Sequence, residues 1–248
     1  MLFPLRNSLG PLGAATAVAA APSPPMTNLI CWLKADAGVY SDAGTTPCAD
    51  GDTVRQWSDQ SGNGNHAVQA TAGNRPTFKV SIVNGLPVVR CIHSRPDTIV
   101  VPADFSTPPW TMGVVATISG SSKQRVIAAV NNNWAFSWLG GGRQWAFYNG
   151  NAPNIVGGPF AADTVWRCYT GEGRTSDGSG YLWENGIETN MGPFATSGPN
   201  AISIGGQVSG GETSDCDVAE LLFYNAQLSD ATRGLLEAYL STRYSLGF

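Results

Sequence analysis

The chain has 248 residues, including 30 Gly, 16 Pro and eight Trp, and its formal net charge at pH 7 is −4. This composition, with only 13% charged residues, favours short strands joined by tight turns over helical packing. The slightly acidic charge, without a basic cluster, argues against nucleic-acid binding. No stretch approaches the roughly 18 apolar residues of a membrane span.

Residues 1–26, MLFPLRNSLGPLGAATAVAAAPSPPM, differ from the rest of the chain because they contain five Pro and one charge, Arg6. A secretory signal with an A-x-A cleavage site is one interpretation, but Pro4 and Pro11 interrupt the stretch that should be continuously apolar. We instead predict an extended arm that docks on a partner or on its own domain. The apolar contacts expected of this arm are Phe3, Leu5, Leu9 and Leu12.

From residue 27 onward, runs of β-branched and aromatic residues alternate with turn residues, and no linker interrupts them. Asn84–Gly85 and Asn185–Gly186 have the tolerance for positive φ that tight hairpin turns need. The predicted strands span residues 29–33, 53–57, 66–70, 87–93, 98–101, 111–118, 125–130, 134–139, 144–148, 164–170, 180–184, 201–204 and 218–224.

One helix is predicted at Asp230–Tyr244, with Ser229 as its N-cap. An apolar stripe that can lie against a sheet is formed by Leu235, Leu236, Tyr239 and Leu240. Residues 27–248 therefore predict a single all-β domain. Its expected architecture is a two-sheet antiparallel β-sandwich of the jelly-roll type, with one C-terminal helix and the extended N-terminal arm.

Several segments carry a resemblance to a known family. They are ICWLKADAGVY, VRQWSDQSGNGNHAVQATAGNRPTF, VWRCYTGEGRTSDGSGYLWENGIE and DVAELLFYNAQLSDATRGLLEAYLSTRYSL, in this order along the chain. The chain resembles laminin-G-like members of the concanavalin A-like lectin/glucanase family, as found in bacterial surface proteins and phage structural proteins. The resemblance implies the fold but no particular ligand, because this fold serves lectins, glycosidases and structural modules.

The stretch WSDQSGNGNHAVQ, residues 57–69, is dense in turn-forming and polar residues. We interpret it as a surface turn in which Gly62 and Gly64 supply positive φ, while Asp59 and the Asn side chains bond to the local backbone. A calcium site through Asp59 is chemically allowed. A catalytic role for His66 lacks a nucleophile and an orienting acid. We therefore predict no metal site and no cofactor, with calcium left possible.

The motif SDCDVAE places Asp215, Asp217 and Glu220 in the spacing of the Glu-x-Asp-x-x-Glu strand of retaining glucanases. Here Asp215 stands where the nucleophilic Glu should be, and its side chain is one methylene shorter. On a regular strand, residues 215 and 217 face opposite to 220, so only a bulge would bring the carboxylates together. A glycoside hydrolase is therefore a minor alternative, and we predict no enzymatic activity.

Trp134, Phe136 and Trp138 share one strand face, and aromatic rows of this kind either fill the space between sheets or stack on sugars. The candidate carbohydrate-binding residues are Trp138, Arg143, Trp145, Tyr148 and Asn149. The five Cys show no CxxC spacing. We interpret them as buried free thiols, and a disulfide between Cys31 and Cys48 remains possible.

Together, the resemblance and the arm predict a non-enzymatic structural or display protein. The expected setting is a phage virion, as a decoration, spike or tail-associated protein. Its arm would bind a capsid or tail protein, and its sandwich would bind a host-surface glycan. A homo-oligomer, such as a trimer, is expected. The alternative is a secreted, extracellular bacterial carbohydrate-binding module, with residues 1–21 as its signal and aromatic residues of the sandwich face as its binding site.

Overall fold

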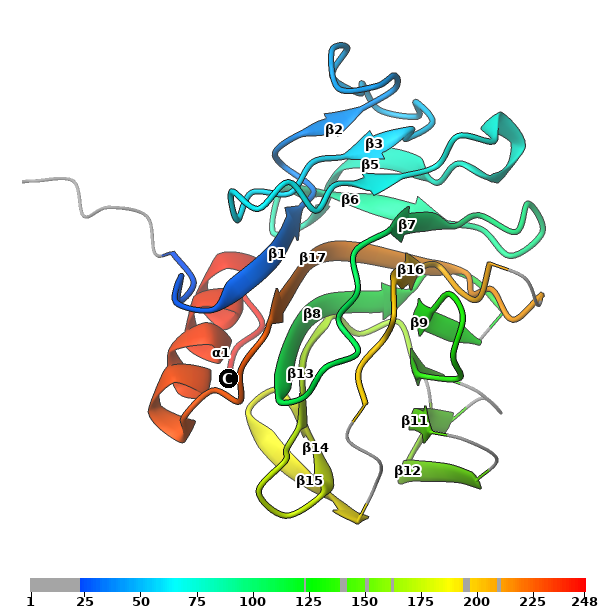
Figure 1. Cartoon of the computed structure of the whole chain (residues 1–248). Helices are drawn as coiled ribbons and strands as arrows, with labels where there is room; N and C mark the ends of the chain where they lie inside the picture. Colours follow the sequence, from blue (N-terminus) through cyan, green and yellow to red (C-terminus); the bar gives the residue numbers. More distant parts are fainter. Residues whose placement is uncertain are drawn as a thin grey trace, which may run out of the picture.

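The computed structural model describes residues 23–122, 124–138, 142–149, 152–161, 163–193, 197–208 and 211–248, and it describes side-chain environments outside 142–149, 152–161 and 189–193. Within this part of the chain, two large antiparallel sheets pack together and one α-helix follows the last strand (Figure 1). The predicted all-β sandwich with a C-terminal helix is confirmed. Most of the predicted arm, residues 1–22, lies outside the described residues.

The larger sheet has eight strands. They are β1 (Leu29–Lys34), β5 (Thr77–Val83), β6 (Leu86–Cys91), β8 (Trp110–Ile118), β13 (Arg167–Gly173), β14 (Ser179–Glu184), β15 (Ile187–Pro193) and β17 (Cys216–Tyr224). Their order is β15-β14-β13-β8-β17-β6-β5. β1 and β6 share one side of β17, because β1 pairs with residues 220–224 and β6 with residues 216–218.

The smaller sheet has seven strands in the order β10-β9-β16-β7-β4-β3-β2. They are β2 (Val39–Tyr40), β3 (Gln56–Trp57), β4 (Ala67–Val68), β7 (Ile99–Val101), β9 (Arg125–Ala129), β10 (Ala135–Ser137) and β16 (Ile202–Ile204). A separate two-stranded ribbon consists of β11 (Gly142–Asn149) and β12 (Ala152–Ala161). A 3₁₀ turn, η1 (Ala72–Asn74), follows β4.

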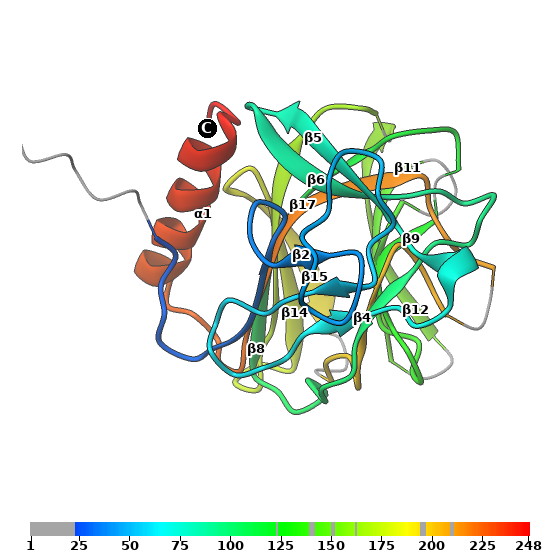
Figure 2. The same cartoon turned by 90° about the horizontal axis from the view of Figure 1, so that it is seen from above.

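Side-chain alternation along β8 separates two apolar clusters. Met112 and Val114 point into the space between the sheets, where they join the main core, whereas Val115 points to the opposite face. That opposite face is covered by the helix α1 (Asp230–Tyr244), which lies on the outer side of the larger sheet (Figure 2). The larger sheet is therefore buried on both faces where the helix covers it.

The helix begins as predicted, because the Ser229 side chain accepts a hydrogen bond from the Thr232 N–H at 3.2 Å. The predicted apolar stripe is wrong at Leu235, whose side chain is 66% exposed. A helix turns about 100° per residue, so Leu236 and its neighbours three and four positions on share a face that Leu235 does not. The side chains buried against the sheet are Leu236, Tyr239, Leu240 and Tyr244.

The two predicted Asn-Gly turns are confirmed. Asn84 and Gly85 have φ values of 47° and 72° between β5 and β6, and Asn185 and Gly186 have 50° and 73° between β14 and β15. Four observed strands, β2, β5, β12 and β15, are missing from the sequence prediction. All four lie at sheet edges, where one flank is unpaired and the sequence pattern is weak.

Candidate functional site

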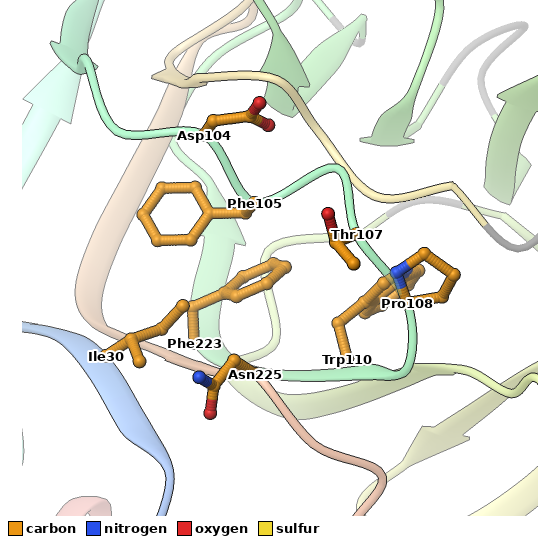
Figure 3. Close-up of a pocket in the computed structure, with 8 residues that line it drawn as sticks. All are labelled: Ile30, Asp104, Phe105, Thr107, Pro108, Trp110, Phe223 and Asn225. Carbon is orange, nitrogen blue, oxygen red and sulfur yellow. The ribbon is translucent and has the colours of Figure 1, made fainter.

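A pocket of about 290 Å³ opens at one end of the sandwich, where β17 ends and β8 begins (Figure 3). The loop between β7 and β8 crosses this end, and it contributes four of the eight lining residues. The residues that line the pocket are Ile30, Asp104, Phe105, Thr107, Pro108, Trp110, Phe223 and Asn225. Segments distant in the sequence therefore meet here, which is typical of a binding site built on a rigid scaffold.

The floor of the pocket is aromatic and belongs to the core between the sheets. Trp110 and Phe223 have no exposed surface, and Phe105 is 4% exposed. The Phe105 and Phe223 ring centroids are 4.9 Å apart, and those of Trp110 and Phe223 are 5.8 Å apart. Because these rings also fill the core, the floor of the pocket is fixed in place.

The rim of the pocket is polar, because Asp104, Thr107 and Asn225 are exposed there. The backbone N–H of Ser106 donates to Asp104 Oδ1 at 2.8 Å. Hydrogen bonds from Ser106 lower the pKa of Asp104 below its usual range, so this carboxylate is ionised at neutral pH. The rim thus combines a charged acceptor, a hydroxyl and an amide, which can both donate and accept.

The loop that carries Asp104 and Thr107 is fastened to the segment around Gly198. Phe105 N–H donates to the Pro199 carbonyl, and Gly198 N–H donates to the Ser106 carbonyl, both at 2.9 Å. A Cβ on Gly198 would collide with the Phe105 carbonyl oxygen, so a glycine is needed for this close approach. These contacts hold the rim of the pocket in position before any ligand arrives.

None of the five predicted carbohydrate-binding residues is among the residues that line this pocket. Trp138 is 1% exposed and packs against Phe136 with ring centroids 5.9 Å apart, so its ring belongs to the core between the sheets. A large aromatic ring on an inward-facing strand is buried by the opposite sheet. The other four candidates lie on β11, whose side chains are outside the described residues: Arg143, Trp145, Tyr148 and Asn149.

The predicted arm contacts also lie outside the described residues: Phe3, Leu5, Leu9 and Leu12. The last part of the arm is described, and there Pro24 is buried. Ser23, Pro24 and Pro25 line a shallow surface pocket together with residues of α1. The arm therefore joins the domain beside the helix.

The pocket itself was not predicted from the sequence. Its rim comes from the segment VPADFSTPPW, residues 101–110, and from Asn225 after the last strand. A Pro-rich loop with Asp and Thr between two strands is a weak signal for a site. That Asn225 would join it depends on strand pairing between β17 and β8.

The stretch 57–69 is the turn that its composition predicts. Gly62 and Gly64 have φ values of 90° and 76°. Asp59 is 8% exposed, and its carboxylate accepts from the N–H groups of Trp32, Ser61 and Asn65 at 2.8–3.0 Å. This carboxylate anchors the turn to β1. Among the described residues, no group of three or more His, Cys, Asp or Glu side chains is placed to hold a metal ion.

Two of the three glucanase-like carboxylates, Asp217 and Glu220, lie on one face of β17, because the strand has a bulge between Val218 and Glu220 in its pairing with β8. Asp215 precedes the strand, and its carboxylate accepts from the N–H groups of His93 and Ser122 at 2.9 and 2.8 Å. The bulge adds one residue to β17, which turns Glu220 to the same side as Asp217. However, Arg90 clamps Asp217 through Nε–Oδ1 and Nη2–Oδ2 contacts of 2.7 Å each. Asp217 is 2% exposed, so its oxygens are occupied by protein groups.

Glu220 is fully buried beneath α1 and accepts hydrogen bonds from four side chains. The donors are Trp32 Nε1 at 2.6 Å, Tyr239 OH at 2.8 Å, Tyr244 OH at 2.7 Å and Arg243 Nε at 3.1 Å. Burial raises the pKa of Glu220, and these donors together with the Arg243 charge oppose that effect. The arrangement ties β1, β17 and α1 together and leaves no access for a substrate.

Another buried carboxylate is Glu172 on β13, and its burial should make the stability of the fold depend on pH. It is fully buried, Arg174 Nε lies 3.0 Å from Oε2, and Oε1 has no hydrogen-bond partner among the described residues. Burial raises its pKa above the usual value of 4.5, so folding is disfavoured progressively as pH rises from there through the raised value. Urea unfolding should show Glu172→Gln gaining stability relative to the native chain between pH 4 and pH 8.

The matched control for that experiment is Asp177→Asn. A hydrogen bond from Tyr181 lowers the pKa of the exposed Asp177, so its contribution to stability is present above its usual pKa and is lost as pH falls. Relative to the native chain, the stability of this variant should therefore stay nearly constant between pH 4 and pH 8 and rise only at lower pH. Parallel profiles for the two variants would contradict the assignment for Glu172.

No family model matches the sequence, and no curated protein matches it. Among solved structures, the chain is similar to the binding domain of Paraclostridial Mosquitocidal Protein 1, with a TM-score of 0.60, 13% identity, and coverage of 88% of this chain and 53% of that chain. The Botulinum Neurotoxin Type G receptor-binding domain gives a TM-score of 0.58, 13% identity, and coverage of 87% and 52%.

A Trypanosoma rangeli sialidase in complex with sialic acid is also similar, with a TM-score of 0.57 and 16% identity. The match covers 91% of this chain but 34% of the sialidase chain. The chain thus spans between about a third and about half of the length of these structures. At these identities the similarities establish the shared β-sandwich fold.

Within the described residues, no helix is long and apolar enough to cross a membrane.

Proposed function

We propose that this chain is a non-catalytic carbohydrate-binding domain and that the pocket at the end of the sandwich takes one sugar unit of a glycan. The observation that carries the proposal is the exposed polar rim of Asp104, Thr107 and Asn225 around a fixed apolar floor. A volume of about 290 Å³ is at the low end of small-molecule sites, which suits a single ring. Two similar structures are described as binding or receptor-binding domains, which supports a binding role.

The charge of the rim favours a neutral sugar. Asp104 is ionised at neutral pH, and the eight lining residues include no Lys, Arg or His to balance it. A carboxylate accepts hydrogen bonds from adjacent hydroxyls, and the Asn225 amide can donate as well as accept. An acidic sugar would face the Asp104 charge without a cationic partner, so its binding would be weaker.

Binding should depend on the rim. In Asn225→Ala and Asp104→Ala, the affinity for the glycan that binds the native chain should fall about 10-fold, because one hydrogen bond to the ligand contributes on the order of 1–1.5 kcal/mol. A panel of neutral and acidic glycans would identify the ligand, and calorimetry would measure the affinities. Asp177→Ala, an exposed carboxylate on another loop, is the control and should bind as the native chain does.

The same experiment separates this pocket from the sites predicted on β11. If Trp145→Ala or Tyr148→Ala abolishes binding while Asn225→Ala has no effect, the sugar binds at β11 instead. If no glycan on the panel binds the native chain, the proposal of a carbohydrate-binding domain fails.

The non-catalytic part of the proposal is supported by Asp217 and Glu220, whose oxygens are engaged by Arg90 and by the four donors beneath α1. A retaining glycosidase needs two carboxyl groups that both reach the substrate. Glycan hydrolysis by the native chain that disappears in Asp217→Asn and in folded Glu220→Gln would overturn it.

The proposed setting is display on a phage virion, in a homo-oligomer such as a trimer, with the arm bound to a capsid or tail protein. Its support is the resemblance of the sequence to laminin-G-like modules. A chain lacking residues 1–26 should then fail to join its particle while its sandwich stays folded, as judged by circular dichroism and particle sedimentation. If the shortened chain still joins the particle, or if no particle takes up the native chain, a secreted bacterial carbohydrate-binding module becomes the better proposal.

A further inference from the structure

Two of the five Cys face each other across adjacent strands. Cys91 ends β6 and Cys216 begins β17, and the two residues are direct partners in the antiparallel register. Both side chains point into the core between the sheets, and neither has any exposed surface. The larger sheet therefore holds a pair of thiols on one face at the end of a ladder.

The backbone geometry of such a pair suits a disulfide. Directly opposed residues of an antiparallel pair have Cα atoms about 4.5–5.5 Å apart. Disulfides span Cα separations of about 4.4–6.8 Å, so the register brings this pair into the range that a disulfide can bridge. A hydrogen bond with Cys216, together with burial, raises the pKa of Cys91 well above the usual thiol value, which places the two sulfurs beside each other.

We propose that Cys91 and Cys216 form a disulfide when the chain folds in the presence of a disulfide oxidant such as oxidised glutathione. One Cys thiolate attacks the oxidant and forms a mixed disulfide, releasing one glutathione thiol. The other Cys then displaces the second glutathione. Two Cys thiols are thereby oxidised to one disulfide, and one oxidant disulfide is reduced to two thiols, which take up the two protons.

Burial determines when this bond forms. A thiol with no exposed surface and a raised pKa supplies little reactive thiolate, so the folded, reduced chain should oxidise slowly. During folding, the same thiols are accessible before the second sheet closes over them. The bond would close a loop from residue 91 to residue 216 and fasten β6 to β17.

The remaining Cys are not arranged this way. Cys31 Sγ donates to the Asn65 carbonyl at 3.7 Å, whereas the half-buried Cys48 donates to the Thr53 carbonyl at 3.9 Å. All five thiols are free in this structure, but those of Cys31 and Cys48 are directed to different carbonyls and so are not placed to be bridged. Cys168 is buried in the cluster beneath α1. These three residues provide the controls.

The test is a thiol count on the full chain, unfolded in urea and refolded with a mixture of reduced and oxidised glutathione. After refolding and blocking, titration in denaturant should find three free thiols of the five, and peptide mapping should find residues 91 and 216 linked. Cys168→Ser should retain two free thiols, whereas Cys91→Ala should retain four. The oxidised native chain should melt on the order of 10 °C above the reduced chain, and Cys91→Ala should show no such difference.

The thiol count of the native chain tests the proposed disulfide even if a variant fails to fold. Five free thiols in chain that has refolded to its native spectrum would overturn the proposal. A link between Cys31 and Cys48 in place of the proposed one would overturn it as well.

Discussion

Replacing Glu220 by Ala should lower the free energy of unfolding by about 3–5 kcal/mol, the usual cost of removing one partner from a buried charge pair. The substitution removes the shared acceptor of the Tyr239 and Tyr244 hydroxyls beneath α1. It also removes one of the two carboxylates that pair with Arg243, which keeps Asp36 at 2.6 Å. It also frees the Trp32 indole N–H, which links β1 to this cluster. Urea unfolding followed by Trp fluorescence would measure the change.

The matched control is Glu188→Ala, which removes an exposed Glu from β15 and should change stability by no more than about 0.5 kcal/mol. Glu220→Gln should fall between the two, because the amide keeps the shape and one acceptor but presents an NH₂ group to donors. A loss below about 1 kcal/mol for Glu220→Ala would contradict the structural role assigned to this carboxylate.

Replacing Trp110 by Ala should also cost about 3–5 kcal/mol, as for other large aromatic side chains removed from a core. Trp110 has no exposed surface and packs against Phe223 and, edge-on at 5.5 Å, against Trp134. The same ring lines the candidate pocket, so the substitution should also abolish glycan binding by deforming the floor. Thermal unfolding and calorimetry would measure the two effects separately.

Ile187→Ala is the control for the loss of a large apolar side chain, because Ile187 is 73% exposed. It should alter neither stability nor binding measurably. If Trp110→Ala folds with native stability, the aromatic floor is not part of the core. If it folds and binds glycan as before, the pocket is not the binding site.

In the SDCDVAE motif, the side-chain directions expected from sequence spacing differ from those in the structure. Strand parity alone predicts that Asp217 and Glu220 face opposite ways, and this prediction is wrong because of the bulge at Val218. The bulge was the condition under which the motif could have been catalytic. It nevertheless directs Glu220 under α1, against Tyr239, rather than into solvent. Convergence of two carboxylates is therefore not enough; access decides whether they can act on a substrate.

The sequence by itself determined the features that depend on local chemistry. Turns need residues that tolerate positive φ, which is why Gly62 and the Asn84 and Asn185 hairpins could be identified. The helix was identified from its cap at Ser229, and the central strands from their apolar runs. Edge strands such as β5 were not predicted from the sequence. They are unpaired on one flank and half-exposed, so little in their sequence pattern distinguishes them from loops.

Only the tertiary structure decided which residues from distant parts of the sequence lie together. Asp104 and Asn225 are 121 positions apart and line the same pocket only because β17 pairs with β8 and the loop after β7 folds over the ends of these strands. The same pairing of distant strands places Cys91 opposite Cys216 and encloses Glu220 beneath the helix. Sequence spacing carries no information on which distant residues come together, because strand order and register depend on how the whole apolar surface is buried.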